Sequence, residues 1–512
     1  MLDSVINLFT FFNEDETFMI GSFRIKKSKF IPRFNINQAL VNKQRLGGRD
    51  ISNPVVSPEA SSWEHMFRAY DIRGIYGKDL TTQIAEIIGR GFGTFIGSGK
   101  KLAVARDIRI GSEQLKKAVV GGLISTGCDV VDFGITTTPM FYFAIAHQNK
   151  DGGVMATASH NPPEWNGFKL CREKGIIVGQ GFGMDKVKDI IAKRRFTKAS
   201  VKGKIKIYKG IVDEYADFVL GRINVKKRLK VVLDTGNSVP GIVAPMLFRR
   251  IGCKVEVLNE KLDGTFPSRS PEPTEASLQQ IIREVKKTRA DLGVGYDADG
   301  DRAVFVDDKG RLLTGDFTSI IFAQAFITKE NRKVVYDVSC TSALEEVIMA
   351  KGGIPVVERV GRPFMMNRVL REKAVFGGER SGHFYFPAIY GLDDGTFASL
   401  KMAEILSQVD TSLSEMVDQI PKHYNSTINV PFPDEHKFTV IQRLKVRFEK
   451  MGFQILDIDG VKAQDERGWV LLRPSNTEPL IRIFAEGKTE GKLAQLLELA
   501  KKILREEAEN IK

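Results

Sequence analysis

Three aspartates stand close together in the segment GYDADGDRAVFVDD, at Asp297, Asp299 and Asp301. Carboxylates this close repel one another unless a cation neutralises them, and their hard oxygen donors favour Mg²⁺ or Ca²⁺. An EF-hand calcium loop does not fit, because it needs a glycine and a glutamate where Arg302 and Asp308 stand. We therefore predict a divalent-cation site on a loop between two strands, with Arg302 suited to a phosphate bound there. A solvated turn is the alternative.

A second segment, GVMATASHNPPEWNGFK, places Ser159 after an apolar strand and before His160, Asn161 and two prolines. Each proline restricts the residue before it, so this run cannot be helical. A rigid loop can present one hydroxyl in a fixed direction, although Ser and Asn are also common turn formers. The segment lacks the GxSxG pattern of a hydrolase nucleophile, and the Ser-His pair alone is weak evidence for a catalytic triad.

The segment GGERSGH offers a carboxylate, a hydroxyl and an imidazole, at Glu379, Ser381 and His383. Such groups on an adaptable loop could bind the vicinal hydroxyls of a sugar, and a plain glycine-rich turn explains them equally well. In FRAYDIRG, Arg73 follows Asp71 closely, for which a structural Arg–Asp pair is the simplest interpretation.

The segment RPSNTEP gathers a guanidinium, two hydroxyls and an amide, at Arg473, Ser475, Asn476 and Thr477. Together with loop N–H groups, this is the composition of a phosphate-binding loop. A capped turn explains the segment as well.

These segments lie among short apolar strands that alternate with amphipathic helices such as SEQLKKAVVGGLIS and PGIVAPMLFRRI. The alternation predicts βαβ units and sheets rich in parallel strands, and its recurrence indicates an internal repeat of one domain. We predict an α/β fold with three similar mixed α/β domains and a smaller C-terminal α+β domain. The predicted boundaries are 63–206 for domain I, 207–311 for domain II, 312–424 for domain III and 425–512 for domain IV.

Residues 1–62 are expected to form a flexible N-terminal extension, because they show weak periodicity and end in the loop-like SNPVVSPEASS. The alternative is that the protein starts later, at Met66.

The first residues lack the basic leader of a secretory signal, and the four scattered cysteines suit reduced thiols in a cytoplasm. The formal charge of +13 favours anionic partners. Since lysines and arginines are spread along the whole chain, we predict small phosphorylated ligands rather than nucleic acid or a membrane. We also predict a monomer or homodimer.

Taken together and in this order, FRAYDIRG, TASHNPPEWNGFK, DADGDR, GGERSGH and RPSNTEP resemble the α-D-phosphohexomutase superfamily, in particular its phosphomannomutase/phosphoglucomutase branch. ARDIRIGS, DFGITTTP, DGTFPSRSPEP and LDDGT add secondary matches, and the resemblance runs from about Phe67 to the C-terminus. It implies four domains around a central cleft, each giving one loop to the site. It also implies an enzyme that interconverts hexose 1-phosphate and hexose 6-phosphate, of mannose or glucose, through a phosphoserine and a 1,6-bisphosphate.

The resemblance implies roles for single residues. Ser159 would be the phosphoserine, and the three aspartates would hold Mg²⁺ together with a phosphate oxygen of that serine. Arg73 and Lys169 would lie by the reacting phosphate, with His160 supporting the loop. A hexose 1,6-bisphosphate would serve as activator. With three residues added from their type and place, the predicted substrate-binding set is Arg302, Arg362, Glu379, Ser381, His383, Arg473, Ser475, Asn476 and Thr477.

Two departures bear on specificity. Ser339 in DVSCT stands where relatives often have lysine, and Arg362 in RVGRPF stands where many have histidine. We hypothesise that Arg362 replaces the lost cation. Three other functions stay open at this point: a phosphoglucosamine mutase, a metal-dependent sugar phosphatase that releases inorganic phosphate, and a non-enzymatic sugar-phosphate sensor. The intact Ser159, metal loop and phosphate loop argue against a sensor.

Overall fold

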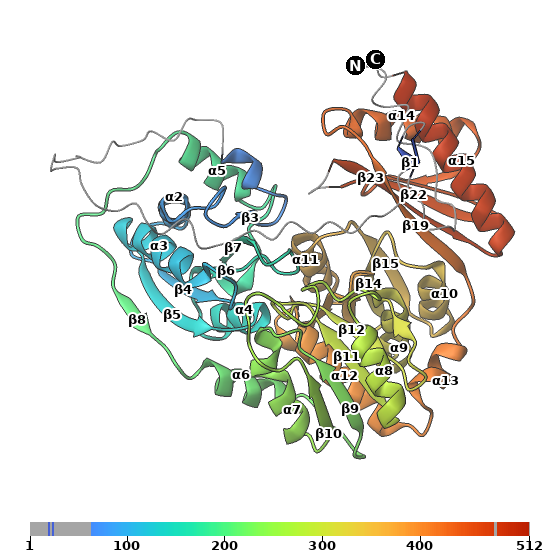
Figure 1. Cartoon of the computed structure of the whole chain (residues 1–512), viewed down its shortest axis with the longest axis horizontal. Helices are drawn as coiled ribbons and strands as arrows, with labels where there is room; N and C mark the ends of the chain where they lie inside the picture. The colour runs from blue at the N-terminus through green and yellow to red at the C-terminus, as the bar shows by residue number, and fades with distance from the viewer. Residues whose placement is uncertain (1–18, 21–22, 25–62, 476–478, 511–512) are drawn as a thin grey trace. The chain divides into compact units, whose positions relative to one another are not determined.

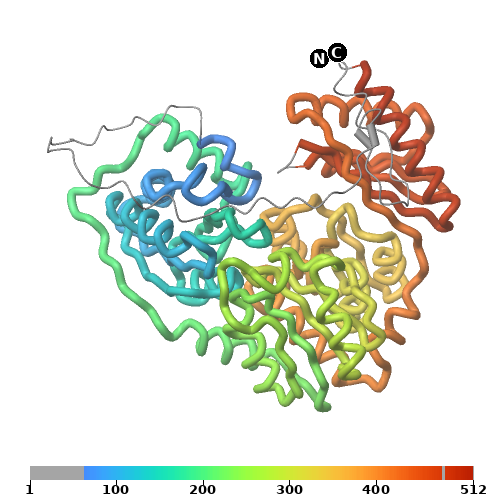
Figure 2. The backbone as a smooth tube through the Cα atoms, viewed as in Figure 1, coloured from blue at the N-terminus to red at the C-terminus, as the bar shows by residue number. Residues whose placement is uncertain are grey.

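The computed structural model describes residues 19–20, 23–24, 63–475 and 479–510. The chain divides into two compact units, Met1–Pro58 and Glu59–Lys512. In the first, strands β1 (Met19–Ile20) and β2 (Phe23–Arg24) pair antiparallel; the rest of the predicted 1–62 extension lies outside the described residues. Figure 2 follows the chain in sequence order through the second unit.

Domain I contains a six-stranded sheet with the order β3-β7-β6-β4-β5-β8. Its central strands β5, β4 and β6 are parallel, while β7 and β3 run antiparallel at one edge. The strands are β3 Ile72–Ile75, β4 Lys101–Arg106, β5 Asp129–Ile135, β6 Gly152–Ala156, β7 Trp165–Arg172 and β8 Ile205–Ile207. The helices are α2 Thr82–Ile96, α3 Ser112–Ser125, α4 Thr138–His147 and α5 Met184–Ala192, with short 3₁₀ turns η2 Glu64–Met66 and η3 Glu173–Gly175 (Figure 1).

Domains II and III repeat one topology. Their sheets have the orders β10-β9-β11-β12-β13 and β15-β14-β16-β17-β18, and β5-β4-β6-β7 of domain I follows the same pattern. Domain II comprises α6 Ile211–Leu220, β9 Lys230–Asp234, η4 Val239–Ile242, α7 Ala244–Arg250, β10 Lys254–Leu258, α8 Gln279–Thr288, β11 Leu292–Tyr296, β12 Ala303–Val306 and β13 Leu312–Leu313. Domain III comprises α9 Gly315–Phe326, β14 Lys333–Asp337, α10 Ser342–Ala350, β15 Ile354–Glu358, α11 Arg362–Glu372, β16 Phe376–Gly378, β17 Phe384–Phe386, η5 Pro387–Ile389, β18 Leu392–Asp393, α12 Gly395–Gln408 and α13 Leu413–Asp418.

The repeat extends to single side chains. In each domain the first strand of the repeat ends at or just before a buried aspartate, at Asp107, Asp234 and Asp337. One oxygen of each carboxylate accepts the backbone N–H two residues later, at distances of 3.0, 2.9 and 2.7 Å. This local bond turns the chain sharply as it leaves the strand. The structure therefore supports the internal repeat that the sequence pattern indicates.

The repeat also fixes where the predicted site loops lie. The Ser159 loop joins β6 to β7, the metal loop joins β11 to β12, and residues 379–383 join β16 to β17. Each of these pairs is antiparallel and occupies the same place in its domain's strand order. Three copies of one hairpin position thus carry the three loops.

Domain IV differs, because its sheet of order β19-β23-β22-β21-β20 is antiparallel throughout. Its elements are β19 Tyr424–Pro431, α14 Lys437–Lys450, β20 Gln454–Leu456, β21 Val461–Asp465, β22 Gly468–Pro474, β23 Leu480–Gly487 and α15 Glu490–Glu509. Val470 and Leu472 of β22 pack into the core that α14 and α15 share, whereas Trp469 and Leu471 contact Val338 of domain III. Alternate residues of one strand therefore serve two interfaces.

One buried apolar cluster runs through domains I, II and III, and domain IV has a core of its own. The predicted fold of three α/β domains and a C-terminal α+β domain is confirmed. The single helix predicted over PGIVAPMLFRRI is wrong: the structure has a 3₁₀ turn followed by α7, because Pro245 lacks an N–H and favours the start of a new helix. In the part of the chain that the structure describes, we found no helix of the length and apolarity that a bilayer span requires.

Candidate active site

Ser159 lies directly against the metal loop. It is 2% exposed and adopts a left-handed backbone conformation with φ of 52°. Its hydroxyl donates to Asp297 Oδ2 at 3.1 Å and lies 3.2 Å from His160 Nδ1. The loop after β6 thus presents one hydroxyl to a carboxylate of another domain, as a rigid loop would.

The three aspartates of the metal loop are fully buried, and the flanks of the loop are strands, as predicted. Burial and the charges of Asp301 and Asp299 raise the pKa of Asp297 well above its usual range. Burial also acts to raise the pKa of Asp301, but the cations of Lys169, Arg362 and Arg302 outweigh it and hold that pKa well below its usual range. The loop therefore holds negative charge more readily on Asp301 than on Asp297.

The donor atoms fit a divalent cation. Side-chain oxygens of all three aspartates lie within 4.8 Å of one another. Asp299 Oδ1 and Asp301 Oδ1 are buried without a hydrogen-bond partner, whereas the Oδ2 atoms of both residues accept hydrogen bonds. A buried carboxylate oxygen without a partner is costly unless something else satisfies it. These oxygens suit Mg²⁺, which prefers hard oxygen ligands.

Two cations hold the outer side of this cluster. Lys169 Nζ, on β7, lies 2.5 Å from Asp299 Oδ2 and 2.5 Å from Asp301 Oδ2. Arg362 Nη1 donates to Asp301 Oδ2 at 3.0 Å and to the hydroxyl of Tyr142 at 2.9 Å. Together these two cations neutralise much of the carboxylate repulsion and fix the Oδ2 side of Asp301.

Arg362 begins α11, directly after Gly361, whose φ is 131°. A Cβ at Gly361 would lie 2.7 Å from ring atoms of Tyr70, so the close approach requires glycine. From this position Arg362 contacts the metal loop of domain II, α4 of domain I and, at 3.8 Å, Asp71. Its place at the carboxylate cluster is not one that the sequence indicated.

We hypothesise that Arg362 replaces a cation lost at Ser339, and in the structure the cation beside Ser339 belongs to another arginine. The guanidinium of Arg380 donates to the carbonyl of Ser339 at 3.2 Å and to Asp316 Oδ2 at 3.2 Å. The hydroxyl of Ser339 donates to Asp337. A cation therefore lies beside Ser339, but it is that of Arg380.

Arg73 and His160 flank the serine. Arg73 donates twice to Asp71 Oδ2, at 2.9 and 2.8 Å, which confirms the predicted Arg–Asp pair. Its third bond reaches the side chain of Asn161, two residues after Ser159. Burial and the cations of Arg302 and Arg73 lower the pKa of His160 well below its usual value. The imidazole beside Ser159 is therefore neutral at pH 7.

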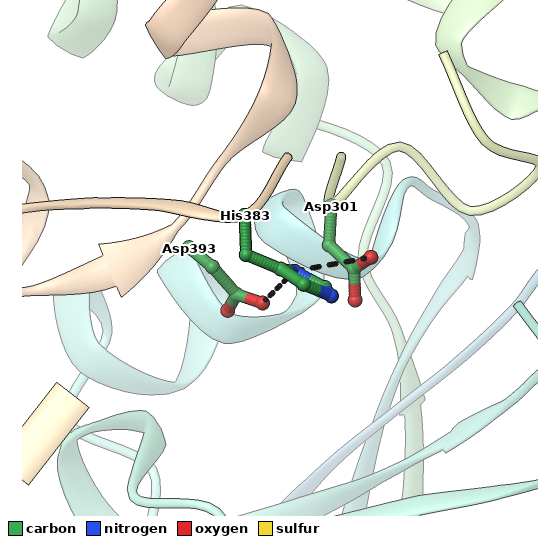
Figure 3. A group of neighbouring side chains, drawn as sticks. All are labelled: Asp301, His383 and Asp393. Atoms are coloured by element: carbon green, nitrogen blue, oxygen red, sulfur yellow. Dashed lines mark ion pairs between the residues drawn. The ribbon is translucent and has the colours of Figure 1, made fainter. Parts of the chain in front are cut away.

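Domain III reaches the metal loop through His383. Figure 3 shows the His383 ring between Asp301 and Asp393, with Nδ1 at 2.9 Å from Asp393 Oδ2 and 3.7 Å from Asp301 Oδ1. Its Nε2 accepts a hydrogen bond from Arg302 Nε at 2.9 Å. Since arginine can only donate, the neutral ring carries its proton on Nδ1, toward the carboxylates. Arg302 is thus bound to His383, one of the other predicted site residues.

Glu379 and Ser381 share the loop of His383 but differ in exposure. Glu379 is 2% exposed and accepts the hydroxyl of Tyr385 at 2.5 Å, and burial raises its pKa. Ser381 is exposed. An exposed hydroxyl and a buried carboxyl can both bond to sugar hydroxyls.

Domain IV holds the rest of the predicted set. Arg473 Nε donates to Asp459 Oδ2 at 2.6 Å, and the same oxygen accepts the N–H of Val360 from domain III at 3.1 Å. The carbonyl of Ser475 accepts a bond from Lys437. Asn476 and Thr477 lie outside the described residues. The structure therefore gathers the loops of domains I, II and III by direct contacts and ties Arg473 to the backbone just before Arg362.

Sequence reasoning missed several residues of this cluster. Asp393 lies in the secondary match LDDGT, and Tyr142 lies in none of the matching segments. Thr138, in DFGITTTP, donates to Asp299 Oδ2 at 2.6 Å. The segments DFGITTTP and LDDGT carried the available signal, because both place polar side chains at the end of an apolar run. Tyr142 lies within an apolar helix and gives no such signal.

Family models match most of the chain in four consecutive parts. They are phosphoglucomutase/phosphomannomutase α/β/α domains I, II and III, over residues 64–198, 213–310 and 314–424, and the C-terminal domain over 428–502. The chain belongs to the phosphoglucomutase/phosphomannomutase family. As a member of this α-D-phosphohexomutase superfamily, it is an isomerase of the intramolecular phosphotransferase class.

Curated relatives agree with this assignment. A phosphoglucomutase/phosphomannomutase of Thermococcus kodakarensis is 36% identical over 86% of this chain and 98% of its own length. A phosphomannomutase/phosphoglucomutase of Pseudomonas putida is 32% identical over 87% and 97%. A phosphoglucosamine/phosphogalactosamine mutase of Sulfurisphaera tokodaii is 34% identical over 86% and 99%.

Solved structures show the same architecture. A phosphoglucomutase/phosphomannomutase family protein of Burkholderia thailandensis has a TM-score of 0.80 at 31% identity, covering 86% of this chain and 97% of its own. A structure described as a phosphomannomutase of Thermus thermophilus has a TM-score of 0.73 at 21% identity, covering 86% and 98%, and supports the fold alone.

Proposed function

We propose that this phosphohexomutase interconverts hexose 1-phosphate and hexose 6-phosphate, with Ser159 as the phosphoryl carrier and a hexose 1,6-bisphosphate as the intermediate. The observation that carries the proposal is the hydroxyl of Ser159, 3.1 Å from Asp297 in a cluster of three buried carboxylates. The Ser159 hydroxyl is buried and points at the carboxylates rather than at solvent, so it lies where a bound cation would meet a phosphate on its oxygen.

The proposed chemistry balances within the site. The bond from phosphorus to Ser159 Oγ breaks as a bond to the free sugar hydroxyl forms, and Ser159 Oγ regains a proton as the sugar hydroxyl loses one. The bisphosphate then returns its other phosphoryl group to Ser159. The two transfers leave no net change in protons or phosphate.

Charge neutralisation is the main catalytic requirement of such a transfer. When bound by Asp297, Asp299 and Asp301, Mg²⁺ supplies a positive charge to the phosphoryl oxygens. Lys169 and Arg73 supply two further cations, and both are already fixed by carboxylates, Lys169 by Asp299 and Arg73 by Asp71. Their preorganisation means that little rearrangement is needed as charge develops.

We propose mannose and glucose phosphates as the substrates, on the resemblance of SHNPPEWNGFK and GGERSGH and the names of two of the relatives above. Glucosamine phosphate is the second candidate, because the Sulfurisphaera tokodaii enzyme is almost as similar, at 34% against 36% identity. Glu379 and Ser381 are the proposed contacts to the sugar hydroxyls, and Arg473 and Ser475 the proposed contacts to the phosphate already on the substrate.

The test is mutase activity with mannose 1-phosphate, glucose 1-phosphate and glucosamine 1-phosphate, in Mg²⁺ with a trace of glucose 1,6-bisphosphate. Wild type and Ser159→Ala are compared, and inorganic phosphate is measured beside the 6-phosphates. Formation of 6-phosphates by wild type alone supports the proposal, and the relative rates identify the substrate. Release of phosphate at the rate of substrate loss would instead identify a sugar phosphatase.

A further inference from the structure

The segment ARDIRIGS has no role in the site described above, yet its second arginine is one of the most buried charged residues. Arg109 is 2% exposed and follows Asp107, the first residue after β4, by two positions. Its guanidinium donates to backbone carbonyls of one loop, the loop that carries Ser159. The acceptors are the carbonyls of Ser159, of Asn161 at 2.6 Å, of Pro162 at 2.8 Å and of Trp165 at 3.2 Å.

These carbonyls converge because the loop is tightly folded. The N–H of Asn161 donates to Ala158 O, the N–H of Trp165 donates to Pro162 O, and the N–H of Ser159 donates to the Thr157 hydroxyl. Ser159 itself has φ of 52°, a conformation that costs a residue with a Cβ about 1–2 kcal/mol. Such a conformation persists when the surroundings over-determine it, and here the surroundings are the four carbonyls held on one guanidinium.

The geometry requires arginine rather than any cation. A guanidinium carries five N–H donors in a planar fork, whereas the ammonium of lysine has three donors on one atom. The Nε edge of Arg109 faces Asp107 Oδ2 at 3.4 Å. The ring of Phe266, from the DGTFPSRSPEP segment of domain II, lies 4.8 Å from the guanidinium carbon. Arg109 is therefore fixed by domains I and II while it holds the loop between them.

We propose that Arg109 is the positioning residue of the phosphoserine loop: it fixes the backbone of Ser159 so that Oγ points at Asp297 and the cation site. This inference rests on the proposed role of Ser159. Arg109 acts through the loop backbone, and its loss changes the direction of Oγ while Lys169 and the carboxylate cluster keep their own contacts. It also gives ARDIRIGS and DGTFPSRSPEP a shared function.

The test compares wild type with Arg109→Lys and Arg109→Ala, with Arg106→Lys as the matched control. Arg106 lies on the same stretch of chain, but its guanidinium donates to Asp107 O and Glu113 instead of the serine loop. For each protein we would measure kcat and KM, the rate of Ser159 phosphorylation by glucose 1,6-bisphosphate from the intact mass, and the unfolding temperature. Ser159→Ala confirms the site of phosphorylation.

A misdirected reacting group costs about 100-fold in rate for a displacement near 1 Å. We therefore expect Arg109→Lys to lower kcat and the phosphorylation rate by about 10- to 100-fold with KM within about threefold, whereas Arg106→Lys retains wild-type rates. Guanidinium chloride at tens of millimolar should restore part of the kcat of Arg109→Ala, and tetramethylammonium chloride at the same concentration should not.

Two results would overturn the inference. One is wild-type kcat and phosphorylation in Arg109→Lys. The other is a loss of rate in Arg109→Lys that comes with an equal rise in KM, without rescue of Arg109→Ala by guanidinium, which would show a general structural role. If wild type itself is not phosphorylated on Ser159 by the bisphosphate, the proposed function fails instead. The lysine variant keeps the charge beside Asp107, so it stays informative if the alanine variant does not fold.

Discussion

The hydroxyl of Ser159 donates to Asp297 Oδ2 at 3.1 Å, across 138 residues of sequence and from one copy of the repeated domain to the next. Both residues lie on the loop between the third and fourth strands of their repeat. The site therefore arises where two equivalent loops meet, one carrying the hydroxyl and the other the carboxylates. Because both side chains are buried, the distance between them depends on how domains I and II pack rather than on solvent.

Removing the hydroxyl tests the carrier role directly. We expect Ser159→Ala to lower mutase kcat by about three orders of magnitude or more, because the phosphoryl group loses its proposed carrier between the two transfers. Binding of glucose 1-phosphate, followed by calorimetry, should change little. Retention of a tenth of the activity would show that Ser159 is not the carrier.

The carboxylate cluster predicts stabilisation by a divalent cation. Mg²⁺ at about 100 times its Kd should raise the free energy of unfolding by about 2.7 kcal/mol. Asp301→Asn should lose most of this increase, because it removes a ligand charge and one of the two free carboxylate oxygens. Glu275→Gln, an exposed carboxylate of domain II, is the control. Urea unfolding with and without Mg²⁺ measures the effect, and an equal Mg²⁺ response in Asp301→Asn would contradict the assignment.

Asp394 predicts a pH dependence outside the reacting groups. Burial raises the pKa of its carboxyl to about 7, although the N–H of Phe397 and the Tyr215 hydroxyl both donate to it. The folded chain therefore binds a proton that the unfolded chain has released above its ordinary pKa of 3.8. Since the folded state binds more protons, the stability contributed by Asp394 falls as pH rises from about 4 to about 7 and is level above that.

Asp394→Asn removes this titration and keeps a side chain that can cap α12. Relative to wild type, the variant should gain on the order of 2–3 kcal/mol in the free energy of unfolding between pH 5 and pH 8. Urea unfolding of both proteins at the two pH values gives this difference, in which the titration of other groups cancels. A difference that is independent of pH would show that Asp394 ionises normally.

The sequence indicated the parts of the site whose chemistry lies in a short window. Three carboxylates in DADGDR and a serine before two prolines constrain their own geometry, so their loops and flanking strands could be predicted. The repeat could be recognised too, since each copy has the same alternation of strand and helix. The local prediction that failed is the single helix over PGIVAPMLFRRI. The hydrophobic pattern continues through Pro245, but one continuous helix cannot form there.

The missing parts are contacts between distant residues. Arg362 reaches Tyr142 across 220 residues and Asp301 across 61, and Arg109 reaches Trp165 across 56. The partners are the hydroxyl of Tyr142, the carboxylate of Asp301 and the carbonyl of Trp165. Nothing in the sequence around either arginine indicates these partners. A buried arginine is recognisable from the fold that surrounds it, because that fold supplies the acceptors that make its burial tolerable.

Arg362 gives the final prediction, because it connects three domains at the metal loop. Arg362→Met keeps much of the side-chain volume but leaves Asp301 with fewer cations and Tyr142 without its donor. Breaking a buried ion pair in this way should lower the free energy of unfolding by about 3–5 kcal/mol, and the altered Asp301 should lower kcat/KM by about 10- to 100-fold. Arg368→Met is the matched control, since this residue lies on the same helix and pairs with Glu372 at a half-buried site. Urea unfolding and steady-state kinetics measure both effects. Normal turnover and KM in Arg362→Met would show that the cation is dispensable, and the function of the cluster would then rest on Lys169.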